Sequence, residues 1–118
     1  MLPRRARMRS SADFRTTVRR GVRVGRPTVV VHADAVDDSD VLVGLVVSKA
    51  VGNAVTRNSV KRQLRHLARS VLPQTPAGSR VVLRALPPAA RSAEDLRRDV
   101  SAAWPNALER LRRREGFS

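Results

Sequence analysis

The sequence predicts an α/β fold, an α+β sandwich in which helices pack on one small sheet. The chain has 118 residues, which is the usual size of one domain. Runs rich in β-branched residues alternate with segments whose apolar residues recur every three or four positions. This alternation is typical of strands and helices that share one core, and it gives the order helix, strand, strand, helix, strand, helix.

The N-terminal part is expected to be a basic arm followed by a short helix. Residues 1–9 contain four arginines and no apolar period, so we expect them to form a disordered arm. Ser10 and Asp13 form a capping-box signal, and Gly21 supplies a stop signal. The helix should therefore span about residues 11–20.

Three strands are expected in the middle of the chain. Residues 28–33 and 41–48 are rich in β-branched side chains, and they are separated by the acidic turn segment 34–40. This pattern predicts a hairpin. A further strand is expected at residues 80–85, and the prolines that begin at Pro87 end it.

The strongest helix prediction covers residues 53–72, where cations follow one face, an apolar stripe follows another, and there is no acid. The apolar stripe consists of Val60, Leu64, Leu67 and Val71. A closing helix should begin at Ser92, which forms a capping box with Asp95, and it should be kinked or interrupted at Pro105. Residues 112–118 are expected to be a flexible tail.

The charge balance favours a polyanionic partner. The chain has 24 Lys and Arg against 10 Asp and Glu, a formal net charge of +14, which repels itself unless phosphates neutralise it. Residues 41–93 contain no acid, as expected of a surface that binds phosphate. Only Lys49 and Lys61 are lysines, and this preference for arginine suits bidentate phosphate contacts, although a GC-rich genome would explain it equally.

Several kinds of chemistry lack their residues. The absence of cysteine excludes disulfides, zinc ribbons and thiol nucleophiles. His32 and His66 have no second metal ligand at a suitable spacing, Ser48 and Ser59 have no partners for a catalytic triad, and no glycine-rich P-loop is present. Without a signal peptide or an apolar run near the ~20 residues that span a bilayer, we expect a cytoplasmic protein that does not bind membranes.

Residues 44–65 read GLVVSKAVGNAVTRNSVKRQLR. This segment resembles the signature of the bacterial ribonuclease P protein subunit, a G-x-x-V-S-K strand end followed by G-N-A-V-x-R-N-x-x-K-R-x-x-R. The order of elements is similar over nearly the whole chain. The resemblance implies a left-handed βαβ crossover through the basic helix, which periodicity alone does not predict because about 98% of such crossovers are right-handed.

The resemblance also implies a function. Ribonuclease P removes the 5′ leader from precursor tRNA, and its RNA subunit holds the catalytic Mg²⁺ ions and breaks the phosphodiester bond. Residues 1–118 would then be a single RNA-binding domain with no catalytic residue and no metal of its own. Its partners would be the ribonuclease P RNA subunit and precursor tRNA, with no obligate protein partner.

The resemblance implies two contact regions. The RNA-binding residues, with Arg69 continuing the basic row, are Lys49, Asn53, Arg57, Asn58, Lys61, Arg62, Arg65 and Arg69. A leader-binding cleft is implied between the first helix and the sheet, where Phe14 matches a stacking aromatic. Val18 and Val31 stand where aromatics are common in the family, so contact there would be van der Waals, with Arg15 or Arg19 compensating.

Two other classes of protein fit parts of the pattern. A ribosomal or other structural RNA-binding protein would share the charge and the lack of catalytic groups, and only cleavage by a reconstituted particle separates it from a processing subunit. A module that binds anionic membranes would need exposed bulky apolar residues on an amphipathic helix. The stripe over residues 60–71 is narrow and better suited to a core.

Overall fold

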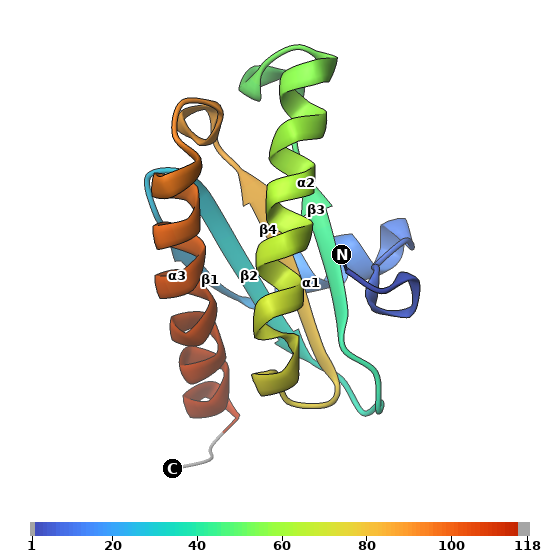
Figure 1. The fold of residues 1–118 in the computed structure, drawn as a ribbon. Helices are drawn as coiled ribbons and strands as arrows, with labels where there is room; N and C mark the ends of the chain where they lie inside the picture. Colours follow the sequence, from blue (N-terminus) through green and yellow to red (C-terminus); the bar gives the residue numbers. More distant parts are fainter. Residues whose placement is uncertain (1, 116–118) are drawn as a thin grey trace.

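A computed structural model describes residues 2–115 of the chain, as helices packed on both faces of one mixed sheet (Figure 1). The α-helices of this part are α1 (Ser11–Arg20), α2 (Ala54–Val71) and α3 (Ala93–Arg114), and the strands are β1 (Val22–Gly25), β2 (Val29–Ala35), β3 (Leu42–Val46) and β4 (Ser79–Ala85). The strand order is β1-β2-β4-β3, in which β3 and β4 are parallel and the other pairs antiparallel. The predicted α+β sandwich is confirmed.

The main core lies between the sheet and the helices α2 and α3. Val31 of β2 and Leu83 of β4 face each other across the sheet and are fully buried, together with Leu64 of α2 and Leu96 of α3. The opposite face of the sheet carries α1, which packs against β2 and β4. We call this second surface of the sheet, together with α1, the α1 face.

The predicted hairpin between residues 28–33 and 41–48 is wrong, because β4 lies between β2 and β3. The segment that joins β2 to β3 crosses over the start of β4. Gly78 accepts a hydrogen bond from the Val36 amide at 2.9 Å and donates one to the Asp40 carbonyl oxygen at 3.1 Å. Val82, in the middle of β4, is fully buried, and a strand covered on both faces belongs at the centre of a sheet.

The connection from β3 through α2 to β4 is left-handed. In Figure 1, β3 and β4 both run upward, α2 lies in front of the sheet, and β4 lies to the left of β3. A right-handed connection would place β4 on the other side of β3. The handedness that the family resemblance implied is confirmed, and it places α2 close to the exposed edge of the sheet.

The helix starts follow the predicted caps. The hydroxyl of Ser10 accepts a hydrogen bond from the Asp13 amide at 3.3 Å, and that of Ser92 accepts one from the Asp95 amide at 3.1 Å. The carbonyl oxygen of the Asn53 side chain caps α2 in the same way, although no cap was predicted there. Each cap satisfies one of the amides that a helix leaves without a partner in its first turn.

The last helix is longer than predicted. α3 continues through Pro105 without an interruption, because Trp104 and Ala107 on either side of it are buried in the core. Its last turn includes residues 112–114, and Arg114 binds the Asp34 carboxylate on β2 at 2.8 Å. The expected tail is therefore helical as far as Arg114, and residues 116–118 lie outside the described residues.

The N-terminal segment is not the disordered arm that its composition suggested. Leu2, Ala6 and Met8 are buried, and the Met8 amide donates a hydrogen bond to the Val43 carbonyl oxygen at 2.8 Å. Arg7 forms an isolated parallel bridge with Val43. These buried side chains and the backbone hydrogen bond attach the basic segment to the edge of β3. Its exposed arginines remain in solvent.

β1 is a further strand that the sequence did not indicate. Its four residues pair with β2 in the true hairpin of the fold, with Val24 opposite Val31 and Arg23 opposite His32. Only Val24 is buried, so the strand has too little apolar pattern to be recognised. Its position matters because it brings Arg23 beside His32 on the α1 face.

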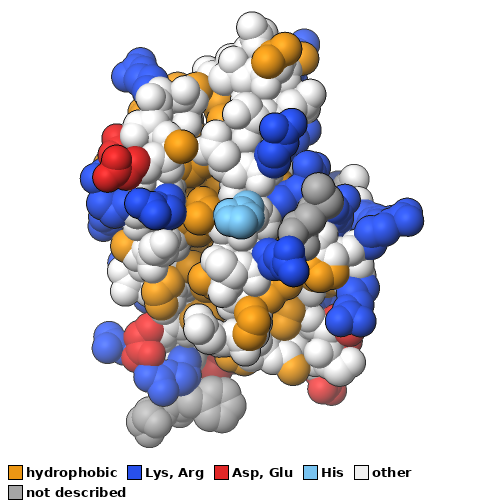
Figure 2. Space-filling view, viewed as in Figure 1, with side chains coloured by type: hydrophobic (Ala, Val, Ile, Leu, Met, Phe, Trp, Pro, Cys, Tyr) orange, Lys and Arg blue, Asp and Glu red, His pale blue; other side chains and the backbone are white. Residues whose placement is uncertain are grey.

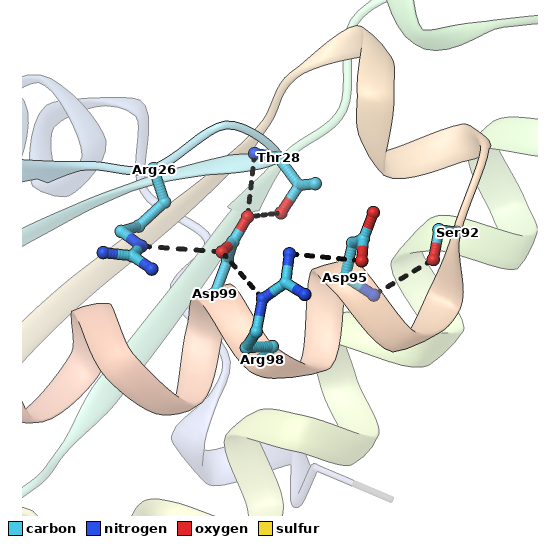
Figure 3. Close-up of polar contacts among 6 residues, drawn as sticks. All are labelled: Arg26, Thr28, Ser92, Asp95, Arg98 and Asp99. Carbon is cyan, nitrogen blue, oxygen red and sulfur yellow. Dashed lines mark hydrogen bonds and ion pairs between the residues drawn. The ribbon is translucent and has the colours of Figure 1, made fainter.

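A buried carboxylate joins α3 to the turn before β2 (Figure 3). One oxygen of Asp99 accepts hydrogen bonds from the Thr28 hydroxyl at 2.6 Å and the Thr28 amide at 3.1 Å, and the other lies 3.5 Å from Arg26 Nε and 3.9 Å from Arg98 Nε. Burial alone would raise the pKa of Asp99. The hydrogen bonds from Thr28 and the charge of Arg26 outweigh burial, so the pKa lies below its usual value.

Candidate nucleic-acid interface

Five cations of α2 and the amide side chain of Asn58 between them form one continuous surface, which we call the α2 surface: Arg57, Asn58, Lys61, Arg62, Arg65 and Arg69. Arg57, Lys61 and Arg65 follow one row at four-residue spacing and are half-buried, so their alkyl stems lie on the protein. Asn58, Arg62 and Arg69 are exposed. The apolar stripe of the same helix is directed into the core, as predicted.

The α2 surface has no counter-charge of its own. Residues 54–71 contain no acid, and within the described part of the chain none of these cations forms an ion pair. Figure 2 shows Lys and Arg side chains gathered over α2 and the adjoining N-terminal segment, with acids at the periphery of the view. A surface of this kind attracts polyanions.

The turn before α2 provides further hydrogen-bond donors, although Asn53, one of the predicted RNA-binding residues, also caps the helix. The carbonyl oxygen of the Asn53 side chain accepts the Thr56 amide at 2.9 Å, so only its amide group is available for RNA. Gly52 has φ 158° and ψ −167°, a conformation that essentially only glycine adopts. Lys49 is exposed on the preceding turn, and Val55 is 78% exposed on the first turn of α2.

The α1 face brings some of the predicted leader-binding residues together. Phe14 lies over Gly44 of β3, where an added Cβ would come within 2.4 Å of the ring, so the glycine makes room for the aromatic side chain. Val18 lies one turn further along α1 and is 42% exposed. Arg15 and Arg19 are exposed on the same helix.

Val31 is not part of this face, so its assignment to the leader-binding cleft is wrong. Its side chain points into the core against α2 and α3 and is fully buried. Because side chains alternate along a strand, an error of one residue moves a side chain to the opposite face. The next residue of β2, His32, lies on the α1 face instead, between Arg23 of β1 and Val82 of β4.

His32 has unusual surroundings for a buried imidazole. Neither ring nitrogen has a hydrogen-bond partner among residues 2–115, although the side chain is only 4% exposed. Burial, followed by the charges of Arg84 and Arg23, lowers the pKa of His32. The lowered pKa favours the neutral form of the ring, which the two arginines flank. The sequence pattern did not single out Arg84 or Arg23.

The described residues lack two other kinds of site. Residues 2–115 contain no group of three His, Asp or Glu side chains placed to hold a metal ion. None of the helices described has both the length and the apolar composition needed to cross a membrane.

Comparisons of sequence identify the relatives of the chain. Residues 2–108 match the family model described as Ribonuclease P. The chain is 51% identical to the ribonuclease P protein component of Corynebacterium diphtheriae, over 97% of this chain and 99% of the relative. It is 52% identical to that of Kocuria rhizophila, over 93% of this chain and 98% of the relative.

The fold leads to the same relatives. The ribonuclease P protein of Staphylococcus aureus superposes with a TM-score of 0.71 at 27% identity, covering 90% of this chain and 91% of that one. The protein of Thermotoga maritima has the same fold, with a TM-score of 0.69 at 22% identity over 91% and 96% of the two chains. The chain therefore belongs to the ribonuclease P protein family, the protein components of the RNA-containing endoribonuclease that matures the 5′ end of tRNA.

Proposed function

We propose that the α2 surface binds the ribonuclease P RNA subunit and that the α1 face contacts the 5′ leader of precursor tRNA. The observation that supports this division most strongly is the acid-free row of cations on α2, which has no ion-pair partner among residues 2–115. A folded RNA offers phosphates at helical spacing, and neutralising them releases condensed counterions. Nothing in the structure favours a purely structural RNA-binding role instead.

The protein acts through position and charge rather than through bond breaking. Mg²⁺ held by the RNA subunit would supply the metal chemistry, and the cations of α2 near that phosphate-rich centre would lower the Mg²⁺ concentration that the particle requires. Arg62 and its neighbours donate from planar guanidinium groups, which bind phosphate with two parallel hydrogen bonds. Reconstitution with purified RNA subunit and precursor tRNA at physiological Mg²⁺ tests the proposal, and failure to stimulate cleavage would contradict it.

On the α1 face, Phe14 and Arg84 provide the contacts for the leader. The ring of Phe14 provides a surface for a base and Arg84 is exposed for a phosphate, whereas the buried ring of His32 is not accessible to the leader. Val18 adds van der Waals contact where an aromatic residue would stack. Leader binding on this face therefore combines one aromatic ring with an aliphatic side chain and arginines.

Replacing Phe14 by Ala should weaken binding of leader-bearing precursor tRNA by about 1–3 kcal/mol, because a stacked base loses its platform. Mature tRNA should bind equally to both proteins. Val18→Ala, on the same helix, is the matched control and should have a smaller effect. Thermal denaturation is measured in parallel, since Phe14 also packs on Gly44. Early melting with equal loss of both RNAs would show that Phe14 acts only in packing.

No side chain of the protein is expected to perform the chemical step. His66→Ala and Ser59→Ala, and His32→Ala at saturating substrate, should each leave the single-turnover cleavage rate within about tenfold, because loss of a general acid or base costs about 10²- to 10⁴-fold. The RNA subunit alone in high Mg²⁺ is the control and should still cleave. An inert RNA, together with a histidine variant that binds normally but does not cleave, would assign the catalysis to the protein.

A further inference from the structure

A small cavity lies at the outer edge of β3, between the α2 surface and the α1 face. Its volume is about 150 Å³, and its walls come from the N-terminal segment, α1, β3 and α2. Three parts of the chain that are distant in sequence, residues 2–14, β3 and α2, thus meet around one hollow. Phe14, Lys61 and Arg65 belong to the two surfaces already assigned to RNA, but the hollow between them has no assigned ligand.

Three cations line the cavity. Arg7, Lys61 and Arg65 are each half-buried, and within residues 2–115 none of them has an acidic partner. Arg7 Nε donates a hydrogen bond to the Leu2 carbonyl oxygen at 3.2 Å, which holds the guanidinium at the cavity. Partly dehydrated cations without a counter-charge are unfavourable, so the cavity favours an anion.

The remainder of the lining is apolar. Leu2, Met8 and Val43 are buried, and Leu45 is half-buried. A ligand that fills the cavity must therefore combine an anionic group with a compact apolar or aromatic body. The volume is about that of a cavity that holds one benzene ring, so the base of a single nucleotide can enter while its sugar and phosphate stay outside, beside the half-buried cations. Sites for single-stranded nucleic acid combine the same two features, cations for the backbone and apolar surface for bases.

The position of the cavity links the two proposed RNA surfaces. Lys61 and Arg65 belong to the α2 surface on one side of the sheet, and Phe14 belongs to the α1 face on the other. β3 is the edge strand, and the N-terminal segment covers it only through the isolated bridge at Val43. An RNA strand can pass from one surface to the other across this edge.

We propose that this cavity binds one unstacked nucleotide of a single-stranded RNA segment. Arg7, Lys61 and Arg65 hold its phosphate, and the base lies against Met8 and Leu45. The proposal rests on the proposed function, because both neighbouring surfaces are assigned to RNA. It adds a discrete nucleotide site, with Arg7 of the N-terminal segment as a contact residue that the family signature does not contain.

The test titrates the full-length protein with UMP and AMP, with uridine, and with inorganic phosphate, and it follows the methyl NMR signals of Met8 and Leu45. We expect saturable binding of both nucleotides with shifts at these methyl groups, weaker binding of phosphate, and none of uridine. Arg7→Gln should weaken nucleotide binding by about three- to tenfold, since a half-exposed charged hydrogen bond is lost. Arg5→Gln is the matched control, exposed in the same turn, and should have no effect.

Equal affinity for nucleotide and phosphate without a shift at Leu45 would overturn the proposal, as would equal effects of Arg7→Gln and Arg5→Gln. The affinity of Arg7→Gln is also measured for the RNA subunit and for precursor tRNA with and without its leader. The RNA that binds more weakly is the one that supplies the nucleotide. Unchanged affinity for all of these RNAs would also overturn the proposal. Cleavage by the reconstituted particle is measured in parallel. Normal cleavage without nucleotide binding removes only the cavity assignment, whereas nucleotide binding without cleavage contradicts the proposed function.

Discussion

Replacing Arg57, Lys61, Arg62 and Arg65 together by Gln should weaken binding of the RNA subunit by about a thousandfold at about 0.15 M salt. Each phosphate contact contributes a slope of about −0.9 to the dependence of log K on log salt, or about 0.7 log units at this salt concentration, and four contacts add to about three log units. The slope of log K against log salt that α2 contributes, about −3 to −5, should become correspondingly less steep. Arg62→Ala alone should reduce the magnitude of this slope by about 1. Filter binding or fluorescence anisotropy at several salt concentrations measures both quantities.

The matched control removes the same charge elsewhere. Arg91, Arg97, Arg112 and Arg113 are exposed and lie outside α2, so their replacement by Gln changes the net charge equally. This control should lose far less affinity, because only the general attraction of the molecule is reduced. Equal losses in the two variants, or a salt slope near zero for the unaltered protein, would contradict a localised phosphate-binding surface.

Asp99→Ala should lower the free energy of unfolding by about 2–5 kcal/mol. The side chain is 1% exposed, and its loss leaves the amide and hydroxyl of Thr28 buried without an acceptor, at about 1–3 kcal/mol for each donor. For a domain of this size the melting temperature should fall by about 10–20 °C. Glu94→Ala, exposed in the first turn of the same helix, is the control and should change little. A loss below about 0.5 kcal/mol would contradict the role of Asp99 in joining α3 to β2.

The stabilisation by Asp99 should depend on pH in one direction. The pKa of Asp99 is lower in the folded protein than in the unfolded chain, so the stabilisation is complete above the unfolded value of about 3.9 and is lost as the pH falls through the folded value. The difference in stability between the unaltered protein and Asp99→Asn should therefore be constant near neutral pH and shrink below about pH 4. A difference that grows on acidification would show the opposite linkage.

The helices could be predicted because their signals are local. Ser10 and Ser92 each cap a helix through the amide three residues later, and each is visible in the sequence as a cap before an amphipathic segment. The acid-free row of α2 was equally visible. What these signals could not give is how the strands pair, because pairing depends on contacts between distant residues.

The errors follow from strands that are apolar on both faces. In β2 the residues from Val29 to His32 are all buried, so the sequence does not show that Val31 faces the core while His32 faces α1. The sequence also predicted that this strand pairs with β3, its neighbour in sequence. The two strands do not pair because β4 lies between them, and a local sequence pattern cannot show this. Met8 was missed because one apolar residue among arginines gives no periodic signal.

The central position of β4 has a consequence for how the chain folds during synthesis. β4 is the last strand to be made, yet β2 and β3 are joined only through it. Until residue 85 has left the ribosome, the sheet can contain no more than the β1–β2 hairpin, and the edges of β2 and β3 remain unpaired. The basic helix α2 is complete earlier, so a nascent chain presents its charge before it presents a folded surface. A fragment that ends before Ser79 would keep the polycation and lose the geometry that makes it specific.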